Sequence, residues 1–431
     1  MCGLRCVDGG MIDFSYFSCY PPSMEILSPA GNVEKLKYAY IYGADAAYIG
    51  IRNFSLRQKA DNFSDEEYKI IRAIKGDKKL YGALNIYFHE GDLDALDANL
   101  DYIGNYPFDA FIISDIGIVR KLQQKFPNTE LHLSTQANCT NSEAVKMYRD
   151  MGFTRVVLAR ETSLKEIERI KTTVPDVELE CFIHGAMCLA YSGRCFLSSW
   201  MAGRSGNQGQ CSHSCRWDYS LKGEMVLEEA KRPGEYYPIY EGDGFTSILS
   251  SKDICMIDHL KELRDAGVDS LKIEGRMKSI YYTAIVTRAY KKAVDALASN
   301  EDITGYKEEL QKVSHREFST GFYFGKEDIE KPTEKSYLRQ FIFMGMIGKK
   351  VGENTWELLV KNQIRPGETL EFIGPDILYI EDSEYIIFDE DGNAVDQADH
   401  GKVYTINTLA AVEEGFILRK KASKTEECPQ A

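Results

Sequence analysis

Five cysteines in the middle of the chain are the residues whose type and spacing most clearly indicate chemistry. Cys188, Cys195, Cys211, Cys215 and Cys255 are separated by 7, 16, 4 and 40 positions. Structural zinc sites usually bring paired cysteines two to four residues apart, and only the Cys211/Cys215 pair comes near that spacing. Irregular thiolates on loops suit an iron–sulfur cluster, because they need only converge in space. Buried, reduced cysteines are the alternative, but five of them in a Gly-, Ser- and Arg-rich segment favour a metal or cluster site.

Polar side chains alternate with apolar ones along three expected strands. The faces that we expect to point inward carry Glu180, Phe182 and His184; Lys272 and Glu274; and His132, Ser134 and Gln136. Asn85 and Arg160 each end another strand and complete the set, although the alternation in the Arg160 strand leaves its direction open. Burying such groups unpaired costs several kcal/mol. They form either a mutually satisfied structural network, such as Lys272–Glu274–Glu180, or the lining of a substrate pocket, which we favour.

The pattern of elements that must position these residues is that of an α/β barrel. Eight short β-like runs alternate with helical patterns between residues 24 and 300, and this is the count of a closed (β/α)8 barrel of the TIM type. The runs are 25–30, 46–50, 80–85, 110–114, 130–136, 155–160, 178–185 and 270–275. Active sites of such barrels form from the loops at the C-terminal ends of the strands.

The seventh unit carries a large insertion, at about 186–250, that contains four of the five cysteines. We therefore expect these cysteines over the C-terminal face of the barrel. Cys255 is expected there too, in the first turn of a helix that starts near Lys252.

The remaining segments divide the chain further. We predict a disordered N-terminal extension over 1–23, a connector over 301–335, a small antiparallel β-barrel domain over 336–420 and a disordered tail over 421–431. Asp391-Gly392 is typical of a hairpin turn in the β domain.

Charge and composition limit the possible partners. The net charge of −14 excludes bulk, non-specific binding of nucleic acid. A local basic and aromatic patch over 186–222 nevertheless suits single-stranded nucleic acid, although its arginines can also merely offset thiolate charge. The patch comprises Arg194, Arg204, Arg216 and Lys222 with Tyr191, Phe196, Trp200 and Trp217. No run is long enough to span a membrane, and eleven cysteines without a signal-like segment indicate a reducing cytoplasm.

A protease interpretation finds little support in the motifs. The chain has neither H-E-x-x-H nor G-x-S-x-G. A His184–Cys188 pair is a conceivable nucleophile and base, but it leaves the other cysteines unexplained.

The run Glu180-x-Phe182-x-x-Gly185-Ala186-Met187-Cys188-x4-Gly193-x-Cys195-x-Leu197-Ser198 resembles the signature of the U32 peptidase (collagenase-like) family. Other stretches are also similar to that family: SPAG at 28–31, LSTQAN at 133–138, QCSHSCRWDY at 210–219, SSKDIC at 250–255, KIEGRMKS at 272–279 and REFSTGF at 316–322. Well-understood branches of the family are oxygen-independent hydroxylation proteins that carry a [4Fe-4S] cluster. The branch that makes 5-hydroxyuridine at the tRNA wobble position, with prephenate as the implied hydroxyl donor, is similar to this chain in length and in its C-terminal domain.

The resemblance implies the cluster ligands, and our hypothesis for the predicted polar pocket adds roles for its residues. The cluster ligands would be Cys188, Cys195, Cys211 and Cys255, with Cys215 as an alternative to Cys211. Lys272, Arg276 and Arg160 would hold the carboxylates of a small dicarboxylate such as prephenate, with Asn85, Ser134 and Gln136 completing the pocket. Glu180 and His184 would move protons, beside Lys272 and Glu274. Two alternatives stay open: a true peptidase acting on collagen-like chains, and a cluster-carrying subunit that needs a paralogous protein partner, as for ribosomal RNA or quinone-precursor hydroxylation.

Overall fold

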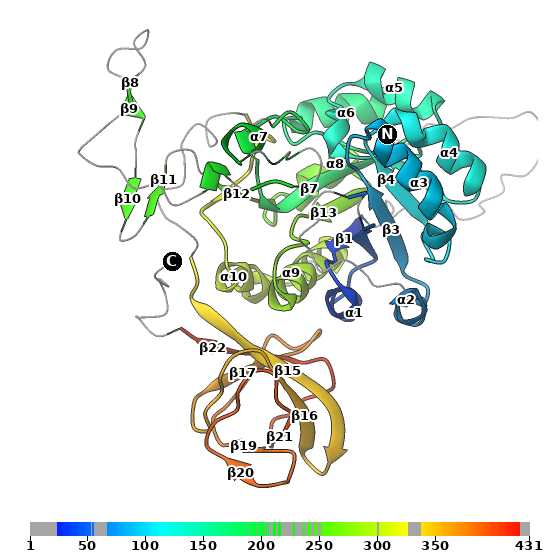
Figure 1. Ribbon diagram of the computed structural model, residues 1–431. Helices are drawn as coiled ribbons and strands as arrows, with labels where there is room; N and C mark the ends of the chain where they lie inside the picture. Colours follow the sequence, from blue (N-terminus) through cyan, green and yellow to red (C-terminus); the bar gives the residue numbers. More distant parts are fainter. Residues whose placement is uncertain are drawn as a thin grey trace, which may run out of the picture.

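The computed structural model describes residues 24–52, 54–55, 67–188, 190–195, 197–202, 204, 206, 210–212, 214–216, 227–228, 236–237, 240–242, 245–247, 251–299, 301–325 and 338–422. The predicted extension over 1–23 and the tail beyond residue 422 lie outside these ranges. Within them the chain forms a barrel that carries helices on its outside, and a second, all-β domain below it (Figure 1).

Eight parallel strands close the barrel, as the alternation of strand and helix patterns predicted. Their order is β13-β1-β2-β3-β4-β5-β6-β7, and β7 pairs with β13 to complete the ring. The strands are β1 (Glu25–Pro29), β2 (Ala46–Gly50), β3 (Lys79–Leu84), β4 (Ala110–Ile113), β5 (Glu130–Leu133), β6 (Arg155–Val157), β7 (Glu178–Ala186) and β13 (Ser270–Ile273). All eight coincide with predicted runs, although β6 ends three residues before Arg160.

The helices follow the strands and cover the outside of the barrel. They are α1 (Val33–Ile41), α2 (Glu67–Lys75), α3 (Glu90–Ile103), α4 (Val119–Lys125), α5 (Ser142–Asp150), α6 (Leu164–Thr173), α8 (Leu260–Asp265) and α9 (Ile280–Ser299), with short 3-10 turns η1 (Ile116–Ile118) and η2 (Thr135–Ala137). Ser163 and Glu166 form a reciprocal capping box at the start of α6. Gly43 and Gly152 end two helices at φ +100° and +97°, a conformation that favours glycine.

The upper end of β7 departs from regular barrel geometry. Lys272 pairs with Phe182, but the next residue of β13, Ile273, pairs with His184, so β7 holds one extra residue at Ile183. Such a bulge reverses the alternation of the side chains that follow it. The end of β7 then pairs antiparallel with β12 (Asp253–Cys255), which in turn pairs with β14 (Phe318–Ser319).

This arrangement corrects the expected place of Cys255. The cysteine lies in the extended strand β12, opposite His184, and the helix that follows begins at Leu260 rather than near Lys252. The segment over 301–335, which we predicted to be a connector, also packs on the barrel. Its described residues form α10 (Thr304–Lys312) and β14. The Tyr323 hydroxyl donates a hydrogen bond to the Phe182 carbonyl of β7 at 2.7 Å.

The insertion after β7 contributes short elements in the described residues. These are α7 (Leu197–Ala202), η4 (Ser214–Arg216), and two small ribbons formed by β8 (Leu227–Glu228) with β9 (Tyr236–Tyr237) and by β10 (Tyr240–Gly242) with β11 (Phe245–Ser247).

The C-terminal domain is a curled antiparallel sheet with its own apolar core, as the strand pattern predicted. Its order is β18-β17-β22-β15-β16-β21-β19-β20. The strands are β15 (Phe341–Gly352), β16 (Thr355–Val360), β17 (Leu370–Ile373), β18 (Ile380–Asp382), β19 (Ile386–Phe388), β20 (Ala394–Val395), β21 (Tyr404–Asn407) and β22 (Ile417–Lys421). The predicted hairpin turn is present: the Gly392 amide donates to the Asp389 carbonyl, between paired β19 and β20.

Buried ion pairs join the two domains. Arg419 of β22 contacts Glu309 of α10 at 2.7 Å, and Arg288 of α9 contacts the same carboxylate at 3.3 Å. Tyr42, which follows α1, donates to the Ile373 carbonyl at 2.7 Å. Separating the domains would leave the buried charges of Arg419 and Glu309 without their partners, which is energetically costly. These ion pairs therefore hold the β domain against the helices on the outside of the barrel.

Candidate functional site

A cavity of about 510 Å³ opens at the C-terminal end of the barrel strands. It is lined by eleven of the predicted site residues, namely Asn85, Ser134, Gln136, Arg160, Lys272, Glu274, Arg276, Cys188, Cys195, Cys211 and the alternative ligand Cys215. Glu180, His184 and Cys255 do not line it. The sequence therefore predicted most of the lining of this cavity, which we call the barrel cavity.

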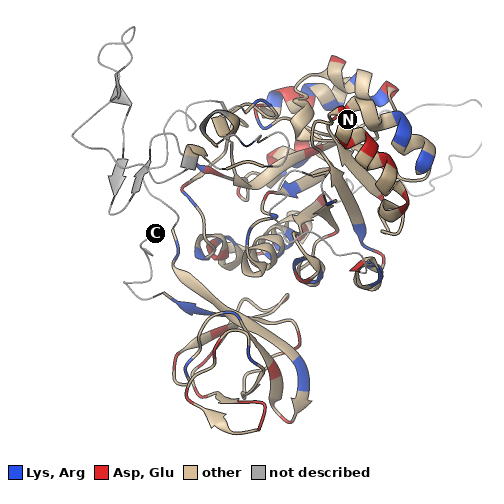
Figure 2. Ribbon diagram, viewed as in Figure 1, with Lys and Arg blue, Asp and Glu red and all other residues tan. Residues whose placement is uncertain are grey.

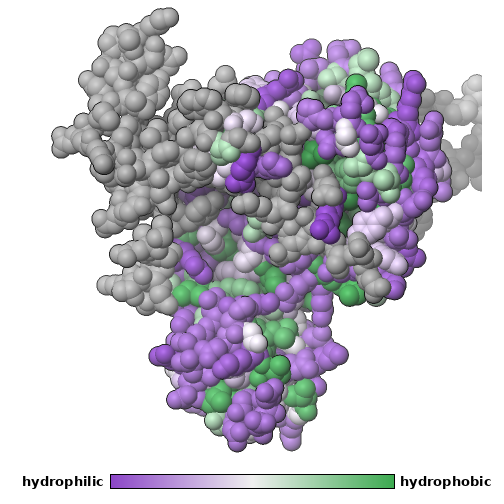
Figure 3. All heavy atoms as spheres, in the orientation of Figure 1, coloured by the Kyte–Doolittle hydropathy of each residue, from purple (hydrophilic) through white to green (hydrophobic). Residues whose placement is uncertain are grey.

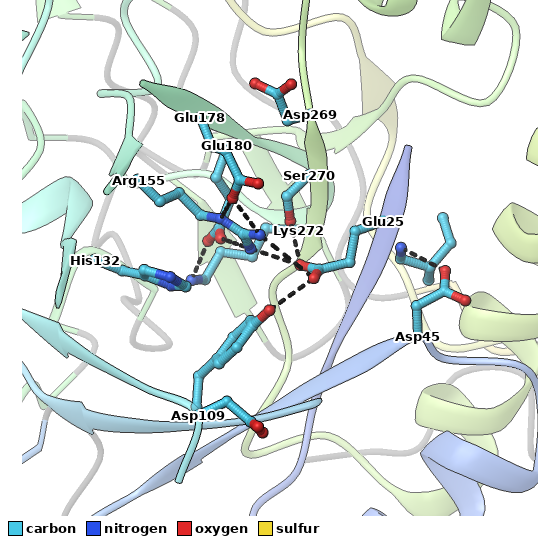
Figure 4. A network of polar contacts seen from close by, with 12 residues as sticks. Glu25, Asp45, Asp109, His132, Arg155, Glu178, Glu180, Asp269, Ser270 and Lys272 are labelled. Carbon is cyan, nitrogen blue, oxygen red and sulfur yellow. Dashed lines mark hydrogen bonds and ion pairs between the residues drawn. The ribbon is translucent and has the colours of Figure 1, made fainter. Parts of the chain in front are cut away.

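A closed network of charges fills the barrel below the cavity (Figure 4). Arg155 contacts Glu25 at 2.6 Å, Glu178 at 2.7 Å and Glu180 at 3.2 Å. The Glu25 carboxylate also accepts hydrogen bonds from Tyr81 at 2.6 Å and from Ser270 at 2.8 Å. Each carboxylate here has a cationic or hydroxyl partner, so the network satisfies itself.

Lys272 connects this network with the cavity. Its ammonium lies 2.5 Å from Glu180 and 4.5 Å from the ring centre of Tyr48. Burial alone would raise the pKa of Glu180, but Lys272 and Arg155 outweigh it and the pKa of this carboxyl is lowered. Burial lowers the pKa of Lys272 from its ordinary 10.5, against the opposing pull of Glu180. Lys272 is thus a cavity amine that is easier to deprotonate than an exposed lysine.

Arg160 closes one wall of the cavity even though it lies beyond the end of β6. Its guanidinium carbon is 3.8 Å from the ring centre of Phe182, and its Nη2 is 3.4 Å from Glu274. The buried Nε–H of Arg160 has no hydrogen-bond partner within the described part of the chain. A buried guanidinium N–H without a hydrogen-bond partner costs free energy. A ligand with an acceptor atom at this position would remove that cost.

Arg276 lies on the opposite wall, above Gly50. Its Nη1 donates to the Ser55 hydroxyl at 3.1 Å. A side chain at Gly50 would collide with it, because an added Cβ would lie 2.4 Å from Arg276 Nη1. The absence of a side chain at position 50 therefore makes room for the guanidinium.

The remaining predicted polar residues line the wall formed by β3 and β5. The Asn85 amide donates to the Ser134 hydroxyl at 3.5 Å, and Ser134 in turn caps the short helix η2 through the Gln136 amide. Gly193 of the insertion packs directly on this helix at φ +73°, where an added Cβ would lie 2.1 Å from the Gln136 carbonyl oxygen. The insertion is therefore held close against the rim of the barrel.

His184 does not point into the barrel, contrary to the prediction. The bulge at Ile183 turns its ring outward, where it lies against Tyr282, Tyr290 and Phe318, and its Nδ1 is 3.3 Å from the Tyr290 hydroxyl. Burial lowers the pKa of His184 to about 3, so the imidazole is neutral. This position also removes the conceivable His184–Cys188 pair, since Cys188 lines the cavity and His184 does not.

Four of the five cysteines meet at the mouth of the barrel cavity. Cys188, Cys195, Cys211 and Cys215 line it, and Cys188 hydrogen-bonds with Cys195. Cys255 lies on β12, with its sulfur 3.7 Å from the Tyr290 hydroxyl. The donor chemistry fits an iron–sulfur cluster. However, among the residues that the structure describes no three His, Cys, Asp or Glu side chains form a ready metal site, so the ligand set remains a prediction.

The predicted basic and aromatic patch is only partly described. Arg194 and Tyr191 are exposed beside the cavity, and Arg204 is half-buried. Phe196, Trp217 and Lys222, and the side chains of Trp200 and Arg216, lie outside the described residues.

Several residues of the site were not predicted. Tyr48 and Lys278 line the cavity, and Glu25 and Arg155 form the network beneath it. The alternation of side chains along β6 could have indicated Arg155, because this residue shares a strand face with Val157, which lines the cavity.

No helix in the described ranges is long and apolar enough to cross a membrane.

Comparison with known proteins places the chain in a family. The model of peptidase family U32 matches residues 31–333, and the model of the U32 C-terminal domain matches residues 339–419. A tRNA hydroxylation protein P1 of Bacillus subtilis is 40% identical over 87% of this chain and 89% of its own length. A tRNA hydroxylation protein P of Escherichia coli is 38% identical over 81% and 86%. A collagenase of Porphyromonas gingivalis is 33% identical over 70% and 74%.

These matches cover both domains, and they include the β7 strand and the cysteine-bearing insertion that build the cavity. The chain belongs to peptidase family U32.

Proposed function

We propose that this protein is a tRNA-modifying enzyme that hydroxylates uridine at the wobble position to 5-hydroxyuridine, in the cytoplasm and without molecular oxygen. Two relatives that match over most of both chains are named tRNA hydroxylation proteins. The observation that carries the proposal further is the charge of the barrel cavity.

The barrel cavity is built for a small anion. Among the described residues, four cationic side chains line it, Arg160, Lys272, Arg276 and Lys278, against one carboxylate, that of Glu274. Guanidinium groups bind carboxylates with strong, oriented hydrogen bonds. A volume of about 510 Å³ falls within the range of small-molecule sites. A dicarboxylate that also carries a hydroxyl group, such as prephenate, fits this lining.

The reaction balances as an exchange between the two substrates. The C5–H bond of uridine becomes C5–OH, which takes two electrons from the base. The donor loses its hydroxyl, gains hydrogen at the same carbon and accepts those two electrons. No other oxidant is needed, which agrees with independence from oxygen.

The side chains around the cavity take different parts in this proposal. Arg160 and Arg276 bind the donor carboxylates, and Asn85, Ser134 and Gln136 orient the rest of the molecule. Lys272, with its lowered pKa, exchanges a proton in the cavity, and Glu274 holds Arg160 in place. Glu180 contacts Lys272 but does not line the cavity, so we assign it a positioning role and assign His184 none in proton transfer.

A [4Fe-4S] cluster held by Cys188, Cys195, Cys211 and Cys255 would supply single-electron chemistry at the cavity mouth. Cys215 lines the same cavity as Cys211, so it remains the alternative ligand. Iron and acid-labile sulfide should be measured on protein purified without oxygen. We expect roughly four of each per chain, with loss in Cys188→Ala and Cys255→Ala and retention in Cys215→Ala. Folded protein without iron would remove the cluster from the proposal.

The proposed reaction can be tested in cells. In a strain that lacks the gene, mass spectrometry of tRNA nucleosides should show loss of 5-hydroxyuridine and its derivatives, restored by the wild-type gene but not by Cys188→Ala. An unchanged nucleoside pattern would contradict the proposal. Activity that appears only when a paralogous protein is added would instead identify a subunit of a paired enzyme. For the peptidase alternative, none of the described residues that line the barrel cavity is a histidine that could serve Cys188 as a base.

A further inference from the structure

A second cavity lies beside the barrel cavity, on the outer side of the same loop. It measures about 550 Å³ and is more open than the first. Gly193 and Cys195 line both cavities, so one short stretch of the insertion separates them. We call this second space the rim cavity. Neither the family models nor the expected donor site accounts for it.

The rim cavity is formed by the ends of neighbouring barrel strands. Tyr87 follows β3, Asp115 and Ile116 follow β4, and Tyr148 comes from α5. Tyr87, Asp115 and Ile116 follow strand ends at the C-terminal face, and Tyr148 reaches the cavity from the last turn of α5, so the rim cavity opens toward the same side as the barrel cavity. A ligand that spans the Cys195 loop would therefore reach both.

The side chains of the rim cavity combine two phenol rings with a cation. The half-buried Tyr87 and Tyr148 lie near the exposed Arg194, since the charge of Arg194 opposes the increase in the pKa of both phenols that burial causes. No carboxylate of the described residues forms an ion pair with Arg194. Ile116 adds an apolar surface that is 55% exposed. Aromatic rings that stack bases beside an arginine that binds phosphate are typical of single-stranded nucleic-acid sites.

The rest of the protein offers RNA a less favourable surface. The C-terminal domain over 338–422 carries nine Lys and Arg residues against fifteen Asp and Glu residues, and the acidic residues are spread along its ribbon (Figure 2). Its exposed face is mostly hydrophilic, with apolar patches (Figure 3). A polyanion is repelled by such a surface. The open mouth of the rim cavity, next to Arg194, is a better place for a nucleotide.

We propose that the rim cavity binds the target nucleotide of a single-stranded RNA loop, stacked on Tyr87 and Tyr148 with a phosphate on Arg194. This rests on the proposed function, and it divides the two substrates: the anionic donor occupies the barrel cavity and the RNA base the rim cavity. Cys195, in the shared wall, lies between them. Asp115, whose carboxylate already accepts the Phe88 and Gly117 amides, keeps further acceptor capacity for an imino N–H of the base.

Binding of a fluorescein-labelled tRNA anticodon stem–loop with uridine at the wobble position tests the proposal. The variants are Arg194→Glu and Ile116→Glu, which alter exposed side chains and leave the core intact. We expect each to raise the Kd at least ~10-fold, because Arg194→Glu removes the phosphate contact and both new carboxylates repel the RNA backbone. Prephenate binding to the same proteins, measured by calorimetry, should change less than ~2-fold.

Arg169→Glu is the matched control, since Arg169 is an exposed arginine on α6, away from both cavities. It should bind the stem–loop like the wild type. Wild-type RNA affinity in both rim variants would overturn the inference while leaving the proposed function intact. A wild-type protein that binds prephenate but no stem–loop, and whose gene deletion leaves tRNA unchanged, would instead remove the proposed function itself. Displacement of the stem–loop by a collagen-like peptide would indicate a peptide site and overturn the inference as well.

Discussion

The lower and upper halves of the barrel interior use the same kinds of charged residue in opposite ways. Below, the buried Arg155 pairs with the half-buried Glu25 and the buried Glu180 at 2.6–3.2 Å. Above, among the described residues that line the barrel cavity, four cations face one carboxylate, that of Glu274. Side chains whose positive and negative charges balance stabilise the fold without any ligand. An excess of positive side chains is instead stabilised when a negatively charged ligand binds. The comparison separates structural from functional charge within one barrel.

The largest effect should follow from removing the centre of the lower network. Arg155→Met leaves the half-buried Glu25 without its guanidinium partner and the buried Glu180 with Lys272 alone, and should lower the free energy of unfolding by about 3–5 kcal/mol. Urea unfolding measures it. Arg149→Met, which removes an exposed arginine paired with Asp150, is the control and should cost at most about 1 kcal/mol. Equal effects of the two changes would contradict a structural role for the network.

A change in the upper half should act on binding instead. Arg160→Gln removes a cation beside Glu274 and should weaken prephenate binding by roughly 10- to 100-fold, the equivalent of about 1.5–3 kcal/mol for a hydrogen bond between charged groups. The unfolding free energy should change by less than about 1 kcal/mol. Calorimetric titration and urea unfolding of the same preparation give both values. A loss of stability with unchanged binding would place Arg160 in the structural class.

Acid should weaken the lower network. The folded-state pKa of Glu180 is lowered from its ordinary 4.5, so its contribution to stability is present above about pH 4.5 and is lost as the pH falls through the folded value. Glu180→Gln should therefore cost several kcal/mol at pH 7, because Lys272 and Arg155 lose their carboxylate partner, and less with each step toward pH 3. Unfolding measured across this range checks the trend. A difference that is independent of pH would show that Glu180 is not an ionised partner.

The smallest effect should come from the outermost member of the same network. The Glu178 side chain contacts Arg155 at 2.7 Å but is 49% exposed. Glu178→Gln should change the free energy of unfolding by about 1 kcal/mol or less, because solvent screens an exposed pair. Thermal unfolding of Glu178→Gln and Arg155→Met under the same conditions compares their stabilities. If Glu178→Gln lost as much stability as Arg155→Met, exposure would not distinguish the members of the network.

The regular parts of the molecule could be predicted from the sequence, because strand alternation and helix caps are local signals. All eight barrel strands and the polar lining at Ser134, Gln136 and Lys272 follow from them. The direction of His184 could not be predicted, because one extra residue at Ile183 reverses the alternation and leaves no mark in the pattern. The position of Cys255 in β12 depends on pairing with a strand about 70 residues earlier, which is equally invisible to local signals.

Features that combine distant segments were also beyond the sequence. The lower network joins Glu25 of β1, Arg155 of β6 and Glu180 of β7, and their contact depends on the depth of each residue in the barrel. The rim cavity is built from loop ends and from α5, whose relative positions no periodicity encodes.

The most direct test of the account uses prephenate that carries heavy oxygen in its ring hydroxyl, with wild-type protein and unmodified tRNA under exclusion of oxygen. Mass spectrometry of the nucleosides reports the origin of the new hydroxyl. We predict 5-hydroxyuridine that carries the heavy oxygen, with no product from the Arg160→Gln protein at donor concentrations that saturate only the wild type. Product without the label, or tRNA that remains unmodified although the protein is folded and its cluster is intact, would contradict the assignment of the barrel cavity to the hydroxyl donor.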